Sequence, residues 1–311
     1  MIKIYKPKFW DKKISFLAAI IFPFSLVFRM LVFLRSKLIK EIDFKMPIIC
    51  VGNIYIGGTG KTPLVLKIYD LLKKNNKKPA IIKKKYKNLH DEIDLIKFYK
   101  KKIFTHKSRS IAIKTAIKKG FNYFILDDGF QDQTIHKDIN ILCFNSNQLI
   151  GNGLTLPAGP LRDPFNRIVK SQIIIINAKK NLHFEKKIKN ISKKIKIFYS
   201  KYEVFKNKKL LSKNILAFAG IGNPDNFFKT LQENDFKVKK MISFPDHYEY
   251  TRNDLIQMIN MARNNKMKII TTEKDFFRIK HFKLKEIESV NIKLKINKEN
   301  KFSNLIKKIK K

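Results

Sequence analysis

The sequence contains little cysteine, and this scarcity excludes two classes of small domain. Only two of its 311 residues are cysteines, Cys50 and Cys143, and both lie in apolar, strand-like runs. Two isolated cysteines provide neither a disulfide framework nor a cysteine-rich zinc site, and they suit a reducing compartment. The six histidines are scattered without metal-ligand spacing. A chain of this length can bury the core of one large or two ordinary domains without disulfides or structural metal sites.

Acidic residues are also scarce, and so is arginine. The chain has 67 lysines and arginines against 25 aspartates and glutamates, a formal net charge of +42, but only eight of the basic residues are arginines. Base recognition favours arginine and patches interleaved with aromatic residues, and the sequence contains no such module. Abundant lysine, isoleucine, asparagine and phenylalanine together are typical of an AT-rich genome. We therefore predict that most of the charge lies on solvated faces. The remainder favours anionic partners, namely membrane lipid, nucleotide or nucleic acid.

The sequence lacks an uninterrupted apolar run long enough to predict a membrane span. Its fifteen uncharged residues at 14–28 include Pro23, whereas a spanning helix needs roughly 20 apolar residues. No small-residue cleavage site follows, so a secretory signal is not predicted. Basic residues on both sides and Trp10 at the start are typical of a helix at the bilayer interface. We predict a membrane-associating segment over residues 1–45, with a buried helical hairpin or a transmembrane anchor as the alternatives.

Beyond residue 45, apolar strand-like runs alternate with helical patterns. The runs lie at 47–53, 80–83, 123–128, 139–144 and 172–177. Continuous apolar strands separated by helices are typical of a parallel sheet covered on both faces. A lysine-rich stretch follows, and the strand-helix pattern restarts at residue 214. We predict an α/β domain over 46–180, a linker region over 181–213 and a smaller α/β domain over 214–311.

The segment IYIGGTGKTP, residues 54–63, resembles a phosphate-binding loop. The strict pattern is a glycine, four free residues and Gly-Lys-Ser/Thr; the last three positions match, but Tyr55 stands in place of the first glycine. The segment follows an apolar strand and precedes a helix, where glycine N–H groups and the helix dipole favour an anion. In this interpretation Lys61 reaches the β- and γ-phosphates and Thr62 contributes to Mg²⁺ binding. A glycine-rich turn without a ligand is the alternative. The predicted nucleotide-binding residues here are Tyr55, Ile56, Gly57, Gly58, Thr59, Gly60, Lys61 and Thr62.

A second element of a nucleotide site follows the apolar run FIL, where the chain continues as DDGFQ. Asp127 and Asp128 at the end of this strand would bind Mg²⁺, and Asp128 would take part in catalysis. Gln131, which follows this turn, would orient metal-bound water. The loop and the acidic strand end together predict an enzyme that transfers phosphate with ATP and Mg²⁺.

Several motifs in one order resemble the tetraacyldisaccharide 4'-kinase family, the lipid A 4'-kinases. They are IYIGGTGKTP, LDDGFQ, GNGLTLPAGPLRDP, FAGIGNPDNFF, SFPDHYEYT and TTEKD. This family transfers the γ-phosphate of ATP to the 4'-hydroxyl of a membrane-embedded acylated glucosamine disaccharide, and its loop also lacks the first glycine. The resemblance, which extends to about residue 275, implies two Rossmann-like α/β/α domains. The larger, N-terminal one has a parallel sheet of the P-loop NTPase type, and the active site lies in the cleft between the two. It also implies an N-terminal membrane-interface helix on the cytoplasmic face of the bacterial inner membrane.

The resemblance further implies a group that accepts a proton. Asp91, in a segment where His90 and Ile93 replace the family's glycine and proline, would pair with His247 to activate the sugar hydroxyl. A helix N-cap is the alternative role for Asp91, and a structural role is the alternative for His247. Arg162 would neutralise phosphoryl charge. Asp163, where the family has glutamate, would assist the metal; we assign TTEKD no catalytic role.

These observations predict an ATP- and Mg²⁺-dependent lipid kinase of lipid A synthesis on an anionic membrane surface. Its expected partner is the acylated disaccharide lipid; no nucleic acid is expected, and no protein partner is inferred. Another P-loop enzyme is one rival, but the Asn/Thr-Lys-x-Asp motif of GTPases is missing from the sequence. A basic nucleic-acid-binding ATPase is the other, and it predicts binding that weakens steeply with salt.

Overall fold

The structure, a computed structural model, describes residues 7–12, 15–86, 90–145, 148–177, 180–204 and 208–309, but not the side chains of residues 90, 91, 208 and 209. These residues form two compact units. The first unit comprises the described residues of Lys6–Tyr86, Lys101–Lys201 and Ile296–Lys311. The second comprises the described residues of Lys87–Lys100 and Tyr202–Lys295.

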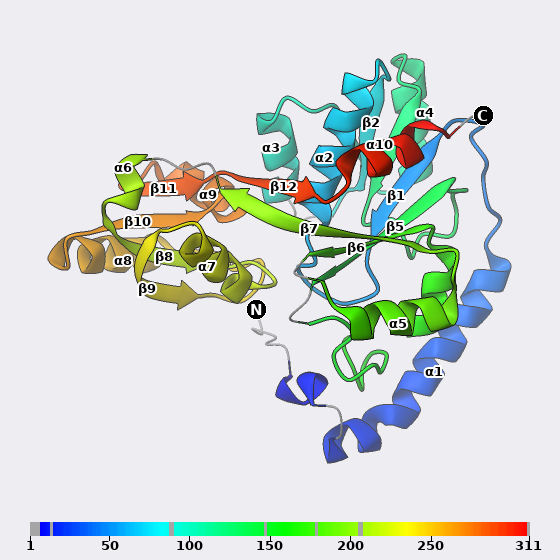
Figure 1. The fold of residues 1–311 in the computed structure, drawn as a ribbon, viewed down its shortest axis with the longest axis horizontal. Coiled ribbons are helices and arrows are strands. Elements are labelled where there is room, and N and C mark those ends of the chain that lie inside the picture. The colour runs from blue at the N-terminus through cyan, green and yellow to red at the C-terminus, as the bar shows by residue number, and fades with distance from the viewer. Residues whose placement is uncertain are drawn as a thin grey trace. The chain divides into compact units, whose positions relative to one another are not determined.

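The first unit contains most of an eight-stranded sheet in the order β12-β7-β6-β5-β1-β4-β2-β3 (Figure 1), and residues 202–204 of β7 and 292–295 of β12 are counted with the second unit. The strands are β1 (Ile48–Gly52), β2 (Pro79–Lys84), β3 (Ile103–His106), β4 (Tyr123–Asp127), β5 (Ile139–Asn145), β6 (Ile173–Asn177), β7 (Lys196–Val204) and β12 (Ile292–Ile296). From β3 to β7 every neighbouring pair is parallel. The five predicted strands are confirmed as the adjacent strands β6, β5, β1, β4 and β2. Strands β1, β4 and β6 are buried along their whole length, as expected for apolar strands with both faces covered.

Helices pack on this sheet and on one another. In the first unit they are α1 (Phe16–Leu38), α2 (Lys61–Lys74), α4 (Arg109–Lys118), α5 (Leu182–Ile191) and α10 (Glu299–Lys307), with short 3₁₀ turns at Lys8–Asp11 and Phe165–Lys170. Helix α2 contacts β1, β2 and β4, and α4 contacts β2 and β3. The buried face of α2 consists of Leu64, Val65, Ile68, Tyr69, Leu71 and Leu72, the spacing of an amphipathic helix.

Both cysteines lie inside this core and are free. Burial raises the pKa of the Cys50 thiol to about 11 and that of Cys143 to about 12. Thiols of such high pKa are almost entirely protonated at neutral pH and are therefore poor nucleophiles.

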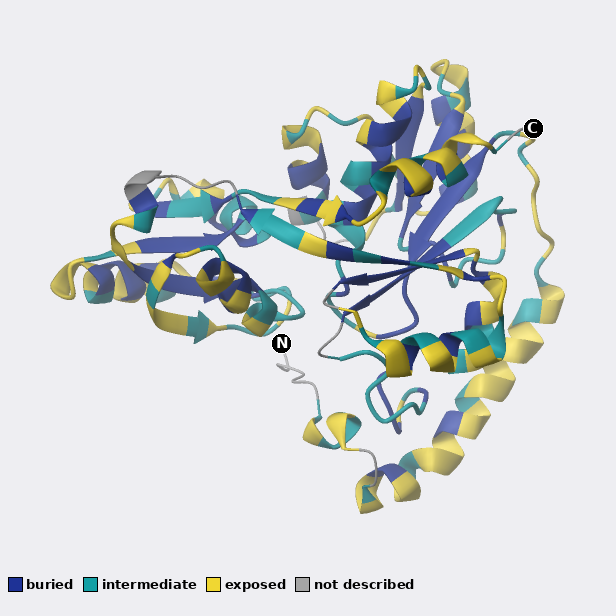
Figure 2. Ribbon diagram, viewed as in Figure 1, coloured by how far each residue is buried: buried dark blue, intermediate teal, exposed yellow. Residues whose placement is uncertain are grey.

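The apolar N-terminal segment forms one long helix. Helix α1 has 23 residues and runs through Pro23, so the expectation that the apolar run is too short to span a bilayer is wrong. It is the one helix in the described part of the chain that is long and apolar enough to cross a membrane, by length and composition alone. Only Ala18 and Ser25 are buried along it, and Figure 2 shows the rest mostly exposed. The buried helical hairpin, one of the two alternatives to the membrane-associating segment, is therefore wrong.

A loop of the first unit holds α1 at its middle. The Ser25 hydroxyl, which is fully buried, donates to the carbonyl of Thr155 at 2.9 Å and accepts from the N–H of Ala158 at 3.0 Å. Before the helix, the indole N–H of Trp10 donates to the carbonyl of Pro157 at 3.1 Å. The N-terminal segment is therefore attached by specific polar contacts while most of its apolar surface is left uncovered.

The second unit has a parallel four-stranded sheet in the order β11-β10-β8-β9. Its strands are β8 (Asn214–Ala219), β9 (Lys237–Ser243), β10 (Met267–Thr272) and β11 (Ile287–Val290). Its helices are α3 (His90–Phe98), α6 (Lys208–Leu211), α7 (Pro224–Glu233), α8 (Arg252–Asn264) and α9 (Glu273–Ile279), followed by a 3₁₀ turn at Lys280–Phe282. The prediction of a second, smaller α/β unit agrees with this architecture.

The units differ from the predicted domains at three places. Residues 181–213 are no linker, because α5 buries Phe184 and Ile188 and β7 belongs to the large sheet. Helix α3 belongs to the second unit, where it packs against α9. Helix α10 returns to the first unit and packs on α2.

Candidate functional site

The loop that joins β1 to α2 is held in shape by the buried side chain of Asn53. Its amide nitrogen donates to the carbonyls of Tyr55 and Gly57 at 2.6 and 3.3 Å and to the Thr59 hydroxyl at 2.9 Å. Gly57 and Gly60 have φ angles of 106° and 87°, which side chains disfavour, so these positions require glycine. A glycine-rich loop between a strand and a helix presents peptide N–H groups to an anion.

Tyr55, which replaces the first glycine of the strict pattern, is an anchor of the loop. It is only 1% exposed and forms an isolated antiparallel bridge with Leu161. Beside it the N–H of Ile56 donates to the carbonyl of Pro160 at 2.9 Å. Tyr55 therefore fastens the loop to residues 160–161, while Ile56 is 41% exposed.

Lys61 and Thr62 are the first two residues of α2, directly after the cap residue Gly60. The first N–H groups of a helix have no partners within the helix and carry its positive dipole end, so this position suits a phosphate. The Lys61 ammonium lies 3.7 Å from Oδ1 of Asp128. The structure thus brings the predicted phosphate-binding lysine next to the predicted acidic strand end.

Asp128 lies between two cations. The guanidinium of Arg162 donates to both of its carboxylate oxygens, at 2.7 and 3.2 Å, and Lys61 faces the same carboxylate. Burial alone would raise the pKa of Asp128, but Lys61, Arg162 and Lys83 outweigh burial and hold that pKa well below its ordinary value. Asp128 is therefore ionised at neutral pH.

Asp127 lies at the end of β4 and is 1% exposed. Its Oδ2 accepts from the Lys83 ammonium at 2.5 Å, whereas its Oδ1 is buried and has no hydrogen-bond partner in the described structure. A buried acceptor without a donor is costly. This oxygen is therefore suited to a ligand such as a cation.

Gln131 and Asp163 form a small polar cluster beside the loop. The Gln131 amide donates to the carbonyl of Asn53 at 2.9 Å and to Oδ2 of Asp163 at 2.7 Å. The Arg167 side chain lies 3.4 Å from Oδ1 of Asp163. Asp163 is 3% exposed, so both of its oxygens face protein groups in this structure.

Four polar residues that shape this region were not predicted from the sequence: Asn53, Lys83, Arg109 and Lys137. Asn53 also accepts from Arg162 through Oδ1, and its place after an apolar strand and before the glycines was a usable signal. Arg109, one of only eight arginines, begins a helix, where a cation opposes the dipole. That unfavourable placement was a second signal. The two lysines gave no signal among so many others.

In the second unit, His247 lies in a polar cluster around Lys274. The Lys274 ammonium is 3.3 Å from Nε2 of His247, 2.9 Å from Oε1 of Glu92 and 3.9 Å from Oδ1 of Asp246. His247 has a φ of 58° and donates its N–H to the carbonyl of Gly220 at 3.2 Å. Lys274 therefore connects the His247 loop with α3, which sequence analysis did not foresee.

The side chain of Asp91 lies outside the described residues, so its predicted pairing with His247 stays a prediction. Its backbone is the second residue of α3 and is followed by Glu92. Its alternative role as a helix N-cap depends on the same side chain and therefore also lies outside the described residues. Asp91 and His247 belong to the same compact unit.

Asp275 of the TTEKD segment is a buried structural centre. Its Oδ2 accepts from the N–H of Gly220 at 3.0 Å and its Oδ1 from Tyr250 at 3.1 Å and from Arg278 at 2.7 Å. A Cβ on Gly220 would lie 2.7 Å from the Tyr250 hydroxyl, so only glycine fits. The segment therefore supports the backbone that holds His247.

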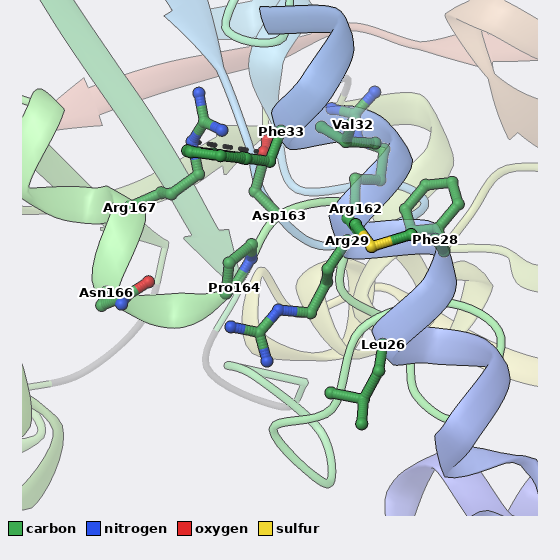
Figure 3. Close-up of a pocket in the computed structure, with 11 residues that line it drawn as sticks. Leu26, Phe28, Arg29, Val32, Phe33, Arg162, Asp163, Pro164, Asn166 and Arg167 are labelled. Atoms are coloured by element: carbon green, nitrogen blue, oxygen red, sulfur yellow. Dashed lines mark ion pairs between the residues drawn. The ribbon is translucent and has the colours of Figure 1, made fainter.

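A cavity of about 460 Å³ lies beside Arg162 in the first unit, between α1 and the segment that follows Leu161 (Figure 3). It is lined by Leu26, Phe28, Arg29, Met30, Val32, Phe33, Arg162, Asp163, Pro164, Asn166 and Arg167. Figure 3 shows Arg29 reaching from α1 toward the segment that carries Pro164. The side chains from α1 are thus mostly apolar. The charged lining residues are three arginines, Arg29, Arg162 and Arg167, and one carboxylate, Asp163.

Comparison with known proteins assigns the chain to a family. The family described as LpxK, tetraacyldisaccharide-1-P 4'-kinase, matches residues 17–311. The chain belongs to this family. The tetraacyldisaccharide 4'-kinase of Pelagibacter ubique (strain HTCC1062) is 39% identical over 311 residues, which cover 99% of this chain and 98% of that protein. That of Rickettsia bellii (strain OSU 85-389) is 31% identical, with 96% and 97% covered.

The tetraacyldisaccharide 4'-kinase fold is confirmed by a solved structure. A crystal structure of the "apo" form of LpxK from Aquifex aeolicus in complex with ATP has a TM-score of 0.70 and 24% identity to this chain. The match covers 94% of this chain and 98% of that one. The family resemblance and the α/β fold predicted from sequence are both confirmed.

Proposed function

We propose that this chain transfers the γ-phosphate of ATP to the 4'-hydroxyl of a tetraacylated glucosamine disaccharide 1-phosphate, a step of lipid A synthesis. The observation that carries the proposal is the meeting of Lys61, Arg162 and Asp128 beside the glycine loop, in a chain that belongs to the 4'-kinase family. Phosphoryl transfer is catalysed chiefly by positioning and by charge stabilisation. Two cations and an ionised carboxylate next to a helix N-terminus provide both.

The loop and its two cations are proposed to bind the triphosphate. Peptide N–H groups of residues 57–62 would hold the phosphate oxygens. Lys61 would contact the β- and γ-phosphates, and Arg162 would neutralise charge that develops on the transferring group. In this structure both cations lie against Asp128, which keeps them close to where the phosphates would bind.

The donor set also fits Mg²⁺. Mg²⁺ prefers oxygen ligands and is usually held by one or two carboxylates together with substrate phosphates. Oδ1 of Asp127 is available, and no group of three or more His, Cys, Asp or Glu ligands occurs among the residues the structure describes. We propose that Asp127, Asp128 and Thr62 hold the ion, with Asp163 and Gln131 in support. When bound with ATP, it would neutralise phosphate charge.

We propose that Asp91 and His247 handle the proton of the acceptor. As the 4'-oxygen bonds to the γ-phosphorus, the bond between that phosphorus and the bridging oxygen breaks, ADP leaves and the hydroxyl proton passes to the Asp91–His247 pair. The Lys274 cluster, which contacts both His247 and the helix that carries Asp91, supports this assignment.

We further propose that the protein works at the cytoplasmic face of the inner membrane. Exposed apolar side chains of α1 would enter the lipid, while the lysine-rich surface would favour an anionic bilayer. The cavity between α1 and Arg162 combines an apolar wall with cations. This combination suits an acylated, phosphorylated sugar, because its acyl chains are apolar and its phosphate is anionic.

The test is direct transfer of label. The protein is incubated with γ-labelled ATP, Mg²⁺ and the dephosphorylated disaccharide lipid in detergent micelles, and the lipid is extracted and counted. Label in the lipid supports the proposal. If none appears while an established 4'-kinase works in parallel, the proposal fails; ATP hydrolysis stimulated by nucleic acid instead would favour the basic ATPase.

Replacing Asp91 with alanine is expected to lower kcat by about 10²- to 10⁴-fold, the usual contribution of a general base. His247→Ala should lower it as well. The double variant should lose much less than the product of the two, since residues that act as a unit are not additive. The matched control is Asp94→Ala, an exposed carboxylate on the same helix. A rate for Asp91→Ala equal to that of Asp94→Ala would remove Asp91 from the mechanism.

Charges placed on the exposed face of α1 are expected to release the protein from membranes. Phe24 and Leu31 are 66% and 58% exposed, so Phe24→Asp combined with Leu31→Asp should leave the fold intact. Burying each side chain in lipid is worth about 1.5–3 kcal/mol, so the partition coefficient into anionic vesicles should fall at least about tenfold. Co-sedimentation measures it. Ile111→Asp, at an exposed apolar residue of α4, is the control and should bind like the unaltered protein.

A further inference from the structure

Four consecutive peptide carbonyls at and after the end of β4 face two cations, of which Arg109 is buried and Lys137 is partly buried. The Arg109 guanidinium donates to the carbonyl of Asp127 at 3.3 Å and to that of Asp128 at 2.7 Å. The Lys137 ammonium donates to the carbonyl of Gly129 at 3.1 Å and to that of Phe130 at 3.3 Å. We call Arg109 and Lys137 together the carbonyl clamp.

Arg109 has no role in stabilising its own helix. It is the first residue of α4, where a positive charge is unfavourable, and its side chain is 6% exposed. Burying a charge is costly unless the charge is paired and hydrogen-bonded. Arg109 meets this requirement with a carboxylate, Oδ2 of Asp132 at 2.8 Å, and with the two turn carbonyls.

Lys137 lies just before β5 and carries its charge against peptide oxygens. In the described part of the chain, the two turn carbonyls are its hydrogen-bond acceptors. Burial lowers the pKa of Lys137, although Asp132 and Glu41 act in the opposite direction. The ammonium loses hydration in this position. Its two hydrogen bonds to the turn indicate that the carbonyls of Gly129 and Phe130 need a donor.

The turn itself requires external support. Asp128 has a φ of 55°, in the left-handed region that residues with a side chain adopt infrequently. Its carboxylate is attracted to Lys61 and Arg162, while its carbonyl accepts from Arg109. The backbone of the turn is therefore held by the clamp on its carbonyls, independently of the groups that contact its carboxylates.

We propose that Arg109 and Lys137 are positioning residues, which hold the turn so that the carboxylates of Asp127 and Asp128 keep the orientation required for nucleotide-bound Mg²⁺. The proposal rests on the proposed function for the reaction it assists. The binding of a divalent cation with nucleotide tests it separately. Neither residue is assigned any contact with phosphate or lipid.

The experiment compares Arg109→Lys and Lys137→Met with the unaltered protein. Lysine keeps the charge of Arg109 but cannot reach both carbonyls and Asp132 together. Methionine is one atom shorter than Lys137 and has neither its charge nor its hydrogen-bond donors. Groups that orient metal ligands typically affect metal affinity or activity by about 10- to 100-fold. We expect kcat to fall within that range and the Mg²⁺ concentration for half-maximal activity to rise by at least about fivefold. The KM for ATP at saturating Mg²⁺ should change by less than about threefold.

A second readout does not depend on activity. Mn²⁺ bound in the presence of ADP is measured by electron paramagnetic resonance, and both variants should bind it about tenfold more weakly. Lys137→Arg should restore most of the affinity. Arg263→Lys, at an exposed ion pair with Glu286 in the second unit, is the control and should match the unaltered protein. Circular dichroism verifies that each variant is folded.

Folded variants with unaltered Mn²⁺ affinity and unaltered Mg²⁺ dependence would overturn the carbonyl clamp, and so would a loss of kcat without any change in cation affinity. If the unaltered protein transfers no phosphate to the lipid, yet the variants lose Mn²⁺ affinity, the proposed function fails and the clamp stands.

Discussion

Replacing Lys61 with alanine is expected to reduce phosphate transfer by about a thousandfold or more. Loss of one preorganised group that stabilises transition-state charge typically costs 10²- to 10³-fold in kcat, and Lys61 would also contact the ground-state phosphates, so KM for ATP should rise too. The Lys61 ammonium lies at the first residue of α2 and 3.7 Å from Asp128. Its backbone position is fixed at the start of the helix, directly after the glycine loop.

The control for this substitution lies on the same helix. Lys67 forms an ion pair with Glu299 at 2.7 Å, and Lys67→Ala removes the same side chain without affecting the loop. Single-turnover and steady-state assays with labelled ATP separate losses in binding from losses in chemistry. Transfer by Lys61→Ala within about tenfold of Lys67→Ala would contradict the role assigned to the loop.

Replacing Asp128 with asparagine is expected to lower kcat by about 10²- to 10³-fold, the second large effect. Asparagine keeps the size and one acceptor but leaves Lys61 and Arg162 without their shared counter-charge. The ion should bind more weakly as well, so excess Mg²⁺ should recover part of the activity. Asp70→Asn is the matched control, since Asp70 is an exposed residue of α2 that forms an ion pair with Lys101. Full activity of Asp128→Asn at ordinary Mg²⁺ would contradict the assignment.

The same substitution has a defined effect on stability. The pKa of Asp128 in the folded protein lies below its ordinary value because Lys61, Arg162 and Lys83 together outweigh burial. The unfolded chain therefore binds the proton more readily, so the carboxylate stabilises the fold above its ordinary pKa of about 4. That contribution is lost as the pH falls through the lower, folded-state pKa. The Tm of the unaltered protein should exceed that of Asp128→Asn at neutral pH, with the difference shrinking below about pH 4; a constant difference would contradict the ion pairs.

The elements predicted correctly from sequence are those with strong local signals. Strands β1, β4, β5 and β6 are continuous apolar runs, and the start of α2 is marked by Gly60 and Pro63. Helix α1 was predicted too short because charged residues were taken as boundaries. A helix exposed along most of its length tolerates Arg29 and Arg35, since neither enters a core.

The parts missed depend on contacts between distant segments. Helix α3 lies in the sequence between two strands of the large sheet, yet its buried face, with Ile93 and Ile96, packs against α9. Helix α10 likewise packs on α2, which is distant in the sequence, and Glu299 of α10 forms an ion pair with Lys67 of α2. No local pattern states which of two cores an amphipathic helix will join. The same limit applies to the partners of Arg109.

The glycine loop and helix α1 are attached to the same short segment of the chain, the loop through the bridge between Tyr55 and Leu161. The N–H groups of Ile56 and Arg162 link the loop to residues 160–162, through the carbonyls of Pro160 and Ile54. A few residues earlier, Thr155 and Ala158 hold Ser25 in the middle of α1. Residues 155–162 thus contact both the middle of α1 and the glycine loop. Helix α1 and the glycine loop are both attached to this segment. In the proposed membrane-bound protein, the depth at which α1 enters the lipid would therefore also set the distance of the loop from the bilayer.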